Sequence, residues 1–265
     1  MGNTQIAGLL LEKGADINLQ VEYYGTALGA AAFQGKKEVV SLLLKKGADV
    51  NALSGHYGSA LQAAVYQGSV EIIYILLENG ADINLAGGHY GSALGAAVYR
   101  KSQEIIDILL EHGADINMAG GYYGSALGVA VYQNSQNLVW VLLEKGADVN
   151  LAGGHYGSAL ATAAYKGSVE MVLLLLDVGA DVNLTGGYYG NALGAAASCA
   201  SMEIVSMLLD EGADITLSNR ALESLLETDS ITNFDQQQIE TLQYLLDTAT
   251  ISDIPLTQPE NESKY

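Results

Sequence analysis

The sequence predicts an all-α repeat solenoid, and two phrases that recur at one fixed spacing predict it. Gly-Ala-Asp followed by Ile or Val recurs every 33 residues, beginning at Gly14, Gly47, Gly80, Gly113, Gly146, Gly179 and Gly212. Tyr-Gly-(Ser/Thr/Asn)-Ala-Leu recurs with the same step, beginning at Tyr24, Tyr57, Tyr90, Tyr123, Tyr156 and Tyr189. A unit of this length cannot bury its own apolar face, so tandem units must stack on one another.

The first half of a unit reads as a turn followed by a helix. In the unit 85–117, the glycine-rich residues 86–91 form the turn. Ser92 then precedes the Ala-rich run 93–99, and its hydroxyl can accept a free amide N–H at a helix start. Other residues of capping type stand at this position in the remaining units: Thr26, Ser59, Ser125, Ser158 and Asn191. We therefore expect a capped first helix in every unit.

The second half of a unit reads as a break and a second helix. In several units a glycine ends the first helix. Lys101 and Ala200 replace this glycine, and each should reduce stability by about 1 kcal/mol if the backbone is left-handed there. Ser102 is interpreted as the N-cap of the second helix, and Ile105 and Leu109 belong to its apolar stripe. The same serine recurs as Ser69, Ser135, Ser168 and Ser201. Each unit is thus turn, helix, helix.

The two ends of the array differ from its interior. Residues 4–18 supply only a second helix, so we expect Ile6, Leu9 and Leu10 to face water in part, and Met1 not to be the start of the ancestral array. Residues 220–227 and 235–247 read as a divergent, polar capping unit. The prediction is six full 33-residue units, an N-terminal half unit and this cap within a repeat domain of residues 1–250, followed by a disordered acidic tail, 251–265.

The second half of each unit resembles the ankyrin repeat family over about residues 4–250. Residues 71–84, Glu-Ile-Ile-Tyr-Ile-Leu-Leu-Glu-Asn-Gly-Ala-Asp-Ile-Asn, carry this resemblance. The first half departs from the family, because Ser-Ala-Leu-Gly (92–95) stands where Thr-Pro-Leu-His is usual, and the tie that this His makes between units is absent. The resemblance implies helix-turn-helix units with projecting hairpins, a turn organised by the Asp of Gly-Ala-Asp, and a protein partner held on the concave face and the hairpin tips.

A narrower resemblance rests on one phrase, Gly-Gly-(His/Tyr)-Tyr-Gly-(Ser/Asn)-Ala-Leu. It looks like the ankyrin arrays common in fungal proteins, including the sensor ends of STAND-type nucleotide-binding signalling proteins. A non-enzymatic protein-binding scaffold is the leading interpretation. The alternative is the sensor fragment of a larger STAND-type signalling ATPase whose catalytic part is not in this chain, and carbohydrate binding fits the tyrosines loosely.

Composition excludes several classes of partner. The chain has 11 Lys and Arg against 30 Asp and Glu, a net charge of −19, which argues against a nucleic-acid partner. No apolar run approaches the ~18 residues that cross a bilayer, and no signal peptide precedes the repeats, so we expect no membrane partner. With Cys199 as the only cysteine, no intrachain disulfide can form. We expect a cytoplasmic protein, with a nuclear location also open.

No residue pattern indicates catalysis, a cofactor or a metal site. Phosphate-binding loops, His-Glu-x-x-His, Cys-x-x-Cys and Gly-x-Ser-x-Gly do not occur. His56, His89 and His155 share one repeat position with Tyr122 and Tyr188, so this position requires a flat ring rather than a metal ligand. We expect no enzyme, no cofactor and no metal.

Aromatic columns are the candidate partner-binding residues. The resemblance places one column in the projecting hairpins: His56, His89, Tyr122, His155 and Tyr188. Another lies at the end of each first helix: Phe33, Tyr66, Tyr99, Tyr132 and Tyr165. Arg100 and Lys166 follow this second column as rare positive charges for an acidic group of the partner. Tyrosine side chains are common in interfaces, but stacked rings can also serve only to pack neighbouring units together. For the column that begins at Tyr24, packing is at least as well supported as binding. For the column that contains Tyr66, binding is favoured.

Overall fold

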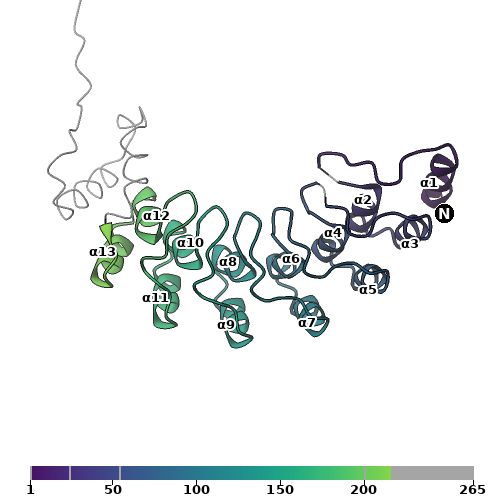
Figure 1. The fold of residues 1–265 in the computed structure, drawn as a ribbon. Helices are drawn as coiled ribbons and strands as arrows, with labels where there is room; N and C mark the ends of the chain where they lie inside the picture. The colour runs from purple at the N-terminus through teal and green to yellow at the C-terminus, as the bar shows by residue number, and fades with distance from the viewer. Residues whose placement is uncertain (1, 24, 54, 200, 216–265) are drawn as a thin grey trace, which may run out of the picture.

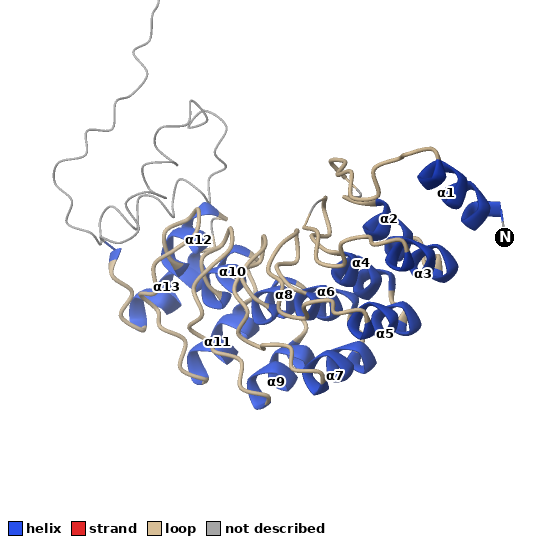
Figure 2. Ribbon diagram, turned by 45° about the vertical axis from the view of Figure 1, so that its right-hand side comes forward, coloured by secondary structure: helices blue, strands red, loops and turns tan. Residues whose placement is uncertain are grey.

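The computed structural model describes residues 2–23, 25–53, 55–199 and 201–215, which form a curved row of helices (Figure 1). Within these ranges no strand occurs; the backbone outside the helices makes only isolated bridges, such as the one between Val21 and Gly25. Figure 2 accordingly shows helices joined by loops. The prediction of an all-α repeat solenoid is confirmed.

The helices lie in two rows. The inner row borders the hairpins on the concave side and consists of α2 (Ala27–Phe33), α4 (Ala60–Gln67), α6 (Ala93–Arg100), α8 (Ala126–Tyr132), α10 (Ala159–Tyr165) and α12 (Ala192–Ser198). The outer row forms the convex side and consists of α3 (Lys37–Lys45), α5 (Val70–Glu78), α7 (Gln103–Glu111), α9 (Gln136–Glu144), α11 (Val169–Asp177) and α13 (Met202–Asp210). The first helix, α1 (Gly2–Glu12), packs on α3.

The core lies between the two rows of helices. Inner helices contribute small residues such as Ala96 and Ala97, which are fully buried and let neighbouring helices approach closely. Outer helices contribute large ones, such as Leu76, Leu109 and Leu142, which are also fully buried. Each inner helix also buries a leucine, such as Leu94 in α6, so small and large side chains together fill the space between units in the manner of a close-packed core.

Side-chain caps start every inner helix, as predicted. Ser92 has an extended backbone with ψ of 168°, and its hydroxyl accepts the amide N–H of Gly95 at 3.0 Å. The same bond to the amide three residues on is made by Thr26, Ser59, Ser125, Ser158 and Asn191. These caps are buried, so the bonds also satisfy polar atoms that water does not reach.

The capping role predicted for the serines before the outer helices is wrong. Ser69, Ser102, Ser135, Ser168 and Ser201 stand at the N-cap position but make no side-chain cap bond. Their ψ angles lie between 85° and 97°, far from the extended value seen at the inner caps. The hydroxyl of Ser168 donates to Asn134 Oδ1 at 2.8 Å instead, so it links one unit to the preceding one.

The turns that end α2, α4, α6, α8 and α10 are left-handed, as predicted for Lys101. Gly68 has φ of 87° there, and Lys101 has φ of 59°. Asn134, which the sequence analysis did not single out, takes φ of 52° at the same position. Asn tolerates this region better than Lys does, so the strain is greatest at Lys101. Ala200 lies outside the described residues.

The N-terminal helix α1 exposes apolar side chains, as expected. Ile6, Leu9 and Leu10 are 60%, 57% and 56% exposed. The predicted capping unit, the domain end at residue 250 and the tail 251–265 lie outside the described residues. No helix in the described ranges is both long and apolar enough to cross a membrane.

Candidate functional site

Backbone hydrogen bonds join neighbouring hairpins into a ladder along the concave edge. The amide of His89 donates to the carbonyl of His56 at 2.8 Å, and the amide of Tyr122 donates to the carbonyl of His89 at 2.8 Å. The same bond links Tyr23 to His56, Tyr122 to His155 and His155 to Tyr188. Hairpins bonded in this way lie about 4.8 Å apart, whereas packed helices need about 8–10 Å. The hairpin edge is therefore the short edge, and the row curves around it (Figure 1).

Glycine permits this close approach. Gly121 has φ of 67°, and a Cβ atom built there would lie 2.2 Å from the amide nitrogen of Gly91. Gly91 has φ of 80°, and its Cβ would lie 2.3 Å from the carbonyl oxygen of Gly120. Since neither distance is possible for a real side chain, the Gly-Gly and Tyr-Gly pairs of the hairpin phrase are steric requirements of the ladder.

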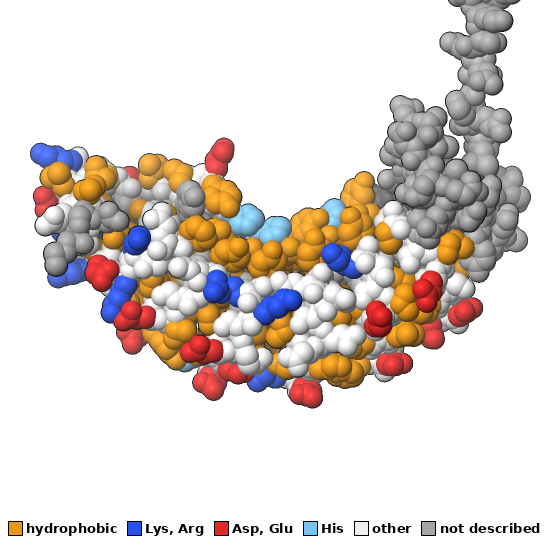
Figure 3. All heavy atoms as spheres, turned by 180° about the vertical axis from the view of Figure 1, so that it is seen from behind, with side chains coloured by type: hydrophobic (Ala, Val, Ile, Leu, Met, Phe, Trp, Pro, Cys, Tyr) orange, Lys and Arg blue, Asp and Glu red, His pale blue; other side chains and the backbone are white. Residues whose placement is uncertain are grey.

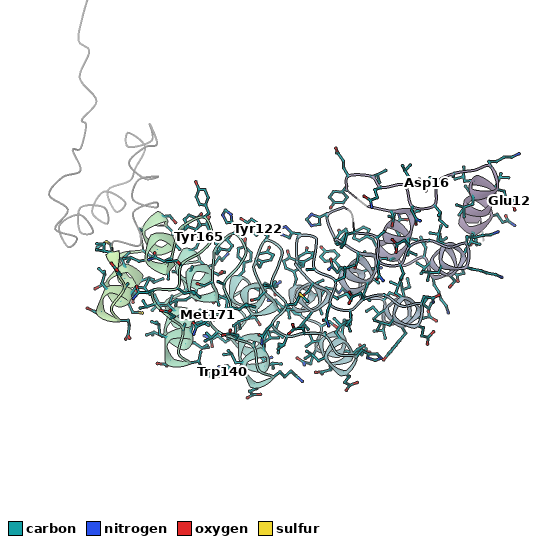
Figure 4. The ribbon with its side chains drawn as sticks, in the orientation of Figure 1. Glu12, Asp16, Tyr122, Trp140, Tyr165 and Met171 are labelled. Carbon is teal, nitrogen blue, oxygen red and sulfur yellow. The ribbon has the colours of Figure 1, made fainter. Side chains whose placement is uncertain are left out.

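The hairpin column of the sequence analysis becomes one continuous stack, here called the tip row. Its members are Tyr23, His56, His89, Tyr122, His155 and Tyr188. Ring centroids of successive members lie 4.8–5.6 Å apart, with interplanar angles of 9–20°. Tyr122 and Tyr188 are 38% and 57% exposed, and Figure 4 shows Tyr122 at the concave edge. The structure thus brings all the predicted hairpin residues together on one accessible surface.

The column that begins at Tyr24 is a packing ladder, here called the middle row. Tyr57, Tyr90, Tyr123 and Tyr156 are 4–7% exposed, and Tyr189 is partly buried; Tyr24 lies outside the described residues. Each makes an edge-on contact with a tip-row ring, as His89 does with Tyr90 at 5.1 Å. Burial raises the pKa of Tyr123 to about 12 and also raises the pKa of Tyr90 and Tyr156. These phenols stay neutral at physiological pH.

The column at the end of the inner helices, here called the helix row, combines packing with exposure. It consists of Phe33, Tyr66, Tyr99, Tyr132 and Tyr165, all partly exposed. Tyr99 shows the arrangement: its ring centroid lies 4.6 Å from that of Tyr90 and 6.3 Å from that of Tyr123. Tyr66, Tyr132 and Tyr165 likewise wedge between two middle-row tyrosines, and Phe33 packs on Tyr57, while all these rings stay partly exposed.

The residues that follow the helix row bridge neighbouring units, which the sequence analysis missed. Arg100 donates from Nη1 to the backbone carbonyl of Tyr66, and Gln133 donates from Nε2 to the carbonyl of Tyr99 at 2.7 Å. The ammonium of Lys166 lies 4.4 Å from the ring centroid of Tyr132. Arg100 and Lys166 nevertheless remain exposed. They stiffen the array and still present positive charge beside the helix row.

Acidic residues are segregated from the concave face. The ranges 51–70, 84–103, 117–136, 150–169 and 183–202 contain the hairpins and inner helices of five units, and none of them holds Asp or Glu. The first hairpin is an exception, because it carries Glu22. Figure 3 shows orange and pale blue side chains along the concave rim, while red acidic side chains gather toward the convex side. A chain of net charge −19 thus keeps one face almost free of carboxylates.

An asparagine ladder supplies a tie between units that the sequence analysis did not foresee. Asn84 Oδ1 accepts the amide N–H of Asp115 at 2.7 Å, and its Nδ2 donates to the carbonyl of Gly113 at 3.1 Å. The pattern repeats at Asn51, Asn117, Asn150 and Asn183. Asp115 Oδ1 accepts from the amide of Asn117 at 2.9 Å, which is the turn-organising role predicted for this Asp. The recurrence of Asn two residues after Asp was the available signal.

The described residues offer no evident metal site. His56 and His89 lie face to face with ring centroids 4.9 Å apart, an arrangement of stacking rather than of convergence on one ion. Among the residues that the structure describes, no three His, Cys, Asp or Glu side chains are grouped so that they could hold a metal.

Two comparisons with known proteins bear on the chain. A family model described as ankyrin repeats matches three times, over residues 1–87, 88–153 and 154–219. The comparison with curated proteins gave no match.

Proposed function

The chain belongs to the ankyrin repeat family, and from this premise we propose that it is a non-enzymatic scaffold that holds a protein partner on its concave face and hairpin tips. Ankyrin repeats are in general protein–protein interaction modules. The proposal includes six full repeats behind an N-terminal half repeat, and a cytoplasmic location.

One observation carries this proposal: the tip row and the helix row, which both pack on the buried middle row, expose aromatic side chains on a face that is almost free of carboxylates. Tyrosine gives a large rigid contact area with a polar tip, which is typical of energetically dominant interface residues. Exposed aromatic surface of this extent is typical of an interaction site in a soluble protein. Tip-row side chains such as Tyr122 and Tyr188 would meet the partner directly.

Capture of partners from a lysate by the intact chain, with identification by mass spectrometry, tests the proposal when matched variants are compared. Tyr122→Ala and Tyr188→Ala each remove an exposed ring from the concave face. The control Trp140→Ala removes an exposed ring from α9 on the convex side, where Trp140 is 47% exposed (Figure 4). We expect the tip-row variants to lose the captured protein and the control to retain it, with all three keeping a cooperative melting transition. If only Trp140→Ala failed to capture the partner protein, the binding surface would be on the convex side.

A second role is that of the sensor part of a larger STAND-type signalling protein. The hairpin phrase with paired glycines supports this role, and it uses the same concave surface. Reading the genomic frame upstream of Met1 for a phosphate-binding loop tests it, because the sensor role requires a nucleotide-binding part in the same chain.

A further inference from the structure

We propose that the concave face recognises an anionic partner: an extended protein segment whose carboxylates meet the edges of the stacked rings. This inference rests on the proposed function, because it specifies the chemistry of the partner at the same surface. Three features carry it: the orientation of the rings, the polar groups at their edges, and the charge around them.

The faces of the tip-row rings are covered by their neighbours. His56 stacks against Tyr23 on one side and His89 on the other, with centroid distances of 5.6 and 4.9 Å. Tyr122 lies in the same way between His89 and His155, at 5.3 and 4.8 Å. What the interior of the row presents to a partner is therefore the rim of each ring.

Ring edges and ring faces attract opposite kinds of group. The edge of an aromatic ring carries the positive end of its quadrupole and the face carries the negative end. Cations and nucleobases bind aromatic side chains through the face, which is occupied here. Tyrosine hydroxyls and imidazole nitrogens add polar groups to the rim, some of them shared with the middle row, as His89 Nε2 is with the hydroxyl of Tyr123 at 3.4 Å. An acceptor-rich group such as a carboxylate fits this rim best.

The charges around the rings favour the same kind of group. No Asp or Glu occurs in the hairpins and inner helices of the five units from residue 51 onward. Arg100, Lys101 and Lys166 are exposed at the ends of α6 and α10, and within the described residues none of them pairs with a carboxylate. Arg100 uses one donor on Tyr66, and a guanidinium has about five. These donors can reach carboxylates that lie along the helix row.

The geometry of the tip row also indicates the length of the bound segment, and the charge of the molecule indicates the salt concentration at which it binds. The tip row advances in steps of 4.8–5.6 Å, so an extended chain that rises about 3.3 Å per residue spans it with roughly eight residues. The acidic convex side repels an anionic segment at long range. At about 0.15 M salt the Debye length is about 8 Å, which screens this repulsion while close contacts persist.

Three peptides test the inference by isothermal titration calorimetry against the intact chain at pH 7 and 0.15 M salt. Each has twelve residues with two Phe at fixed positions, and the peptides differ only in carrying Glu, Gln or Lys at every second position. We expect the Glu peptide to bind at least tenfold more tightly than either the Gln peptide or the Lys peptide.

Matched variants place the site of binding. Arg100→Gln combined with Lys166→Gln removes two charges and introduces the residue that already bridges units at Gln133. We expect this double variant to weaken the Glu peptide at least fivefold. Lys145→Gln removes one charge from the end of the outer helix α9 and should leave its affinity unchanged.

The remaining outcomes overturn the inference. Equal or tighter binding of the Gln or Lys peptide, or no binding of any peptide, would show that the face does not select anionic segments. Binding of uridine, which offers a nucleobase without a charged phosphate, would show that ring faces are accessible after all. None of these results decides the proposed function, which fails if the tip-row variants still capture the protein.

Discussion

Glycine at the hairpin contacts is the residue-scale feature on which the curvature depends. Gly121→Ala should destabilise the array strongly, because its Cβ would lie 2.2 Å from the backbone of the neighbouring hairpin as well as requiring positive φ. The matched control is Gly113→Ala, where φ is +90° but no atom lies within 4 Å of the added Cβ. We expect the control to cost about 1–2 kcal/mol, the penalty of left-handed backbone alone. Urea unfolding of both variants measures the difference, and equal losses would contradict the steric explanation.

His89 links the stability of the ladder to pH. Its ring contacts His56, Tyr90, Tyr122 and Tyr123, and no carboxylate is among these contacts. Burial, followed by the charge of His56, lowers the pKa of His89 from its ordinary 6.5. A lowered pKa in the folded state means that the unfolded chain binds the proton more readily. The contribution to stability is thus present above pH 6.5 and is lost as the pH falls below it.

His89→Tyr tests this pH dependence, because Tyr122 and Tyr188 show that a tyrosine fits the tip row. We expect the variant to lose less stability than the parent chain between pH 7.5 and 5.5, as measured by urea unfolding at both values. Titration of groups far from His89 cancels in this comparison. Identical pH dependence in the two proteins would assign the effect to residues other than His89.

At the scale of elements, both rows of helices supply the core, and the buried leucines of the outer helices test its register. Leu76→Ala in α5 and Leu142→Ala in α9 each remove a fully buried side chain and should cost about 2–5 kcal/mol. Leu173→Ala in α11 is the control, since Leu173 is 46% exposed and should cost less than about 0.5 kcal/mol. Denaturant unfolding that gave a loss below about 0.5 kcal/mol at Leu76 or Leu142 would show that the helical register is wrong.

Helix α1 is the element expected to open first. It packs on α3 but lacks an inner partner helix among the described residues, and Ile6, Leu9 and Leu10 face water. Hydrogen exchange should show the amides of residues 4–12 exchanging before those of residues 103–111 in α7, which is enclosed by neighbouring units. Equal protection of the two helices would mean that the exposed face does not weaken α1.

Features that arise from neighbouring residues in the sequence could be predicted, whereas features that arise from contacts between units could not. The inner caps followed from one residue type before an apolar run, and the left-handed turn at Lys101 followed from the glycines at its equivalents. The serines before the outer helices have the same chemistry as Ser92, but their backbone ψ is near 90°, which the sequence does not reveal. The asparagine ladder joins residues 31 positions apart, so it became visible only once the units were stacked.

At the scale of the whole molecule, curvature follows from two unequal spacings. Neighbouring hairpins, which are linked by backbone hydrogen bonds, are separated by a distance typical of paired strands. Neighbouring packed helices are separated by nearly twice that distance. The sequence predicted which columns would lie on the concave side and gave packing at least equal support for the column that begins at Tyr24, but it did not predict that the tip row would stack into one continuous file or how completely the middle row would be buried. Both results depend on how closely the hairpins approach, which is a property of the assembled array.

A hydrogen-exchange footprint of the bound partner tests the central claim, that the concave face is the binding surface. The amides of the hairpins, for example residues 88–91 and 121–124, and the ends of α6 and α8 should gain protection when the captured protein is added. The outer helices α7 and α9 should exchange as in the free chain. Protection confined to the outer helices, with the hairpins unchanged, would contradict the claim.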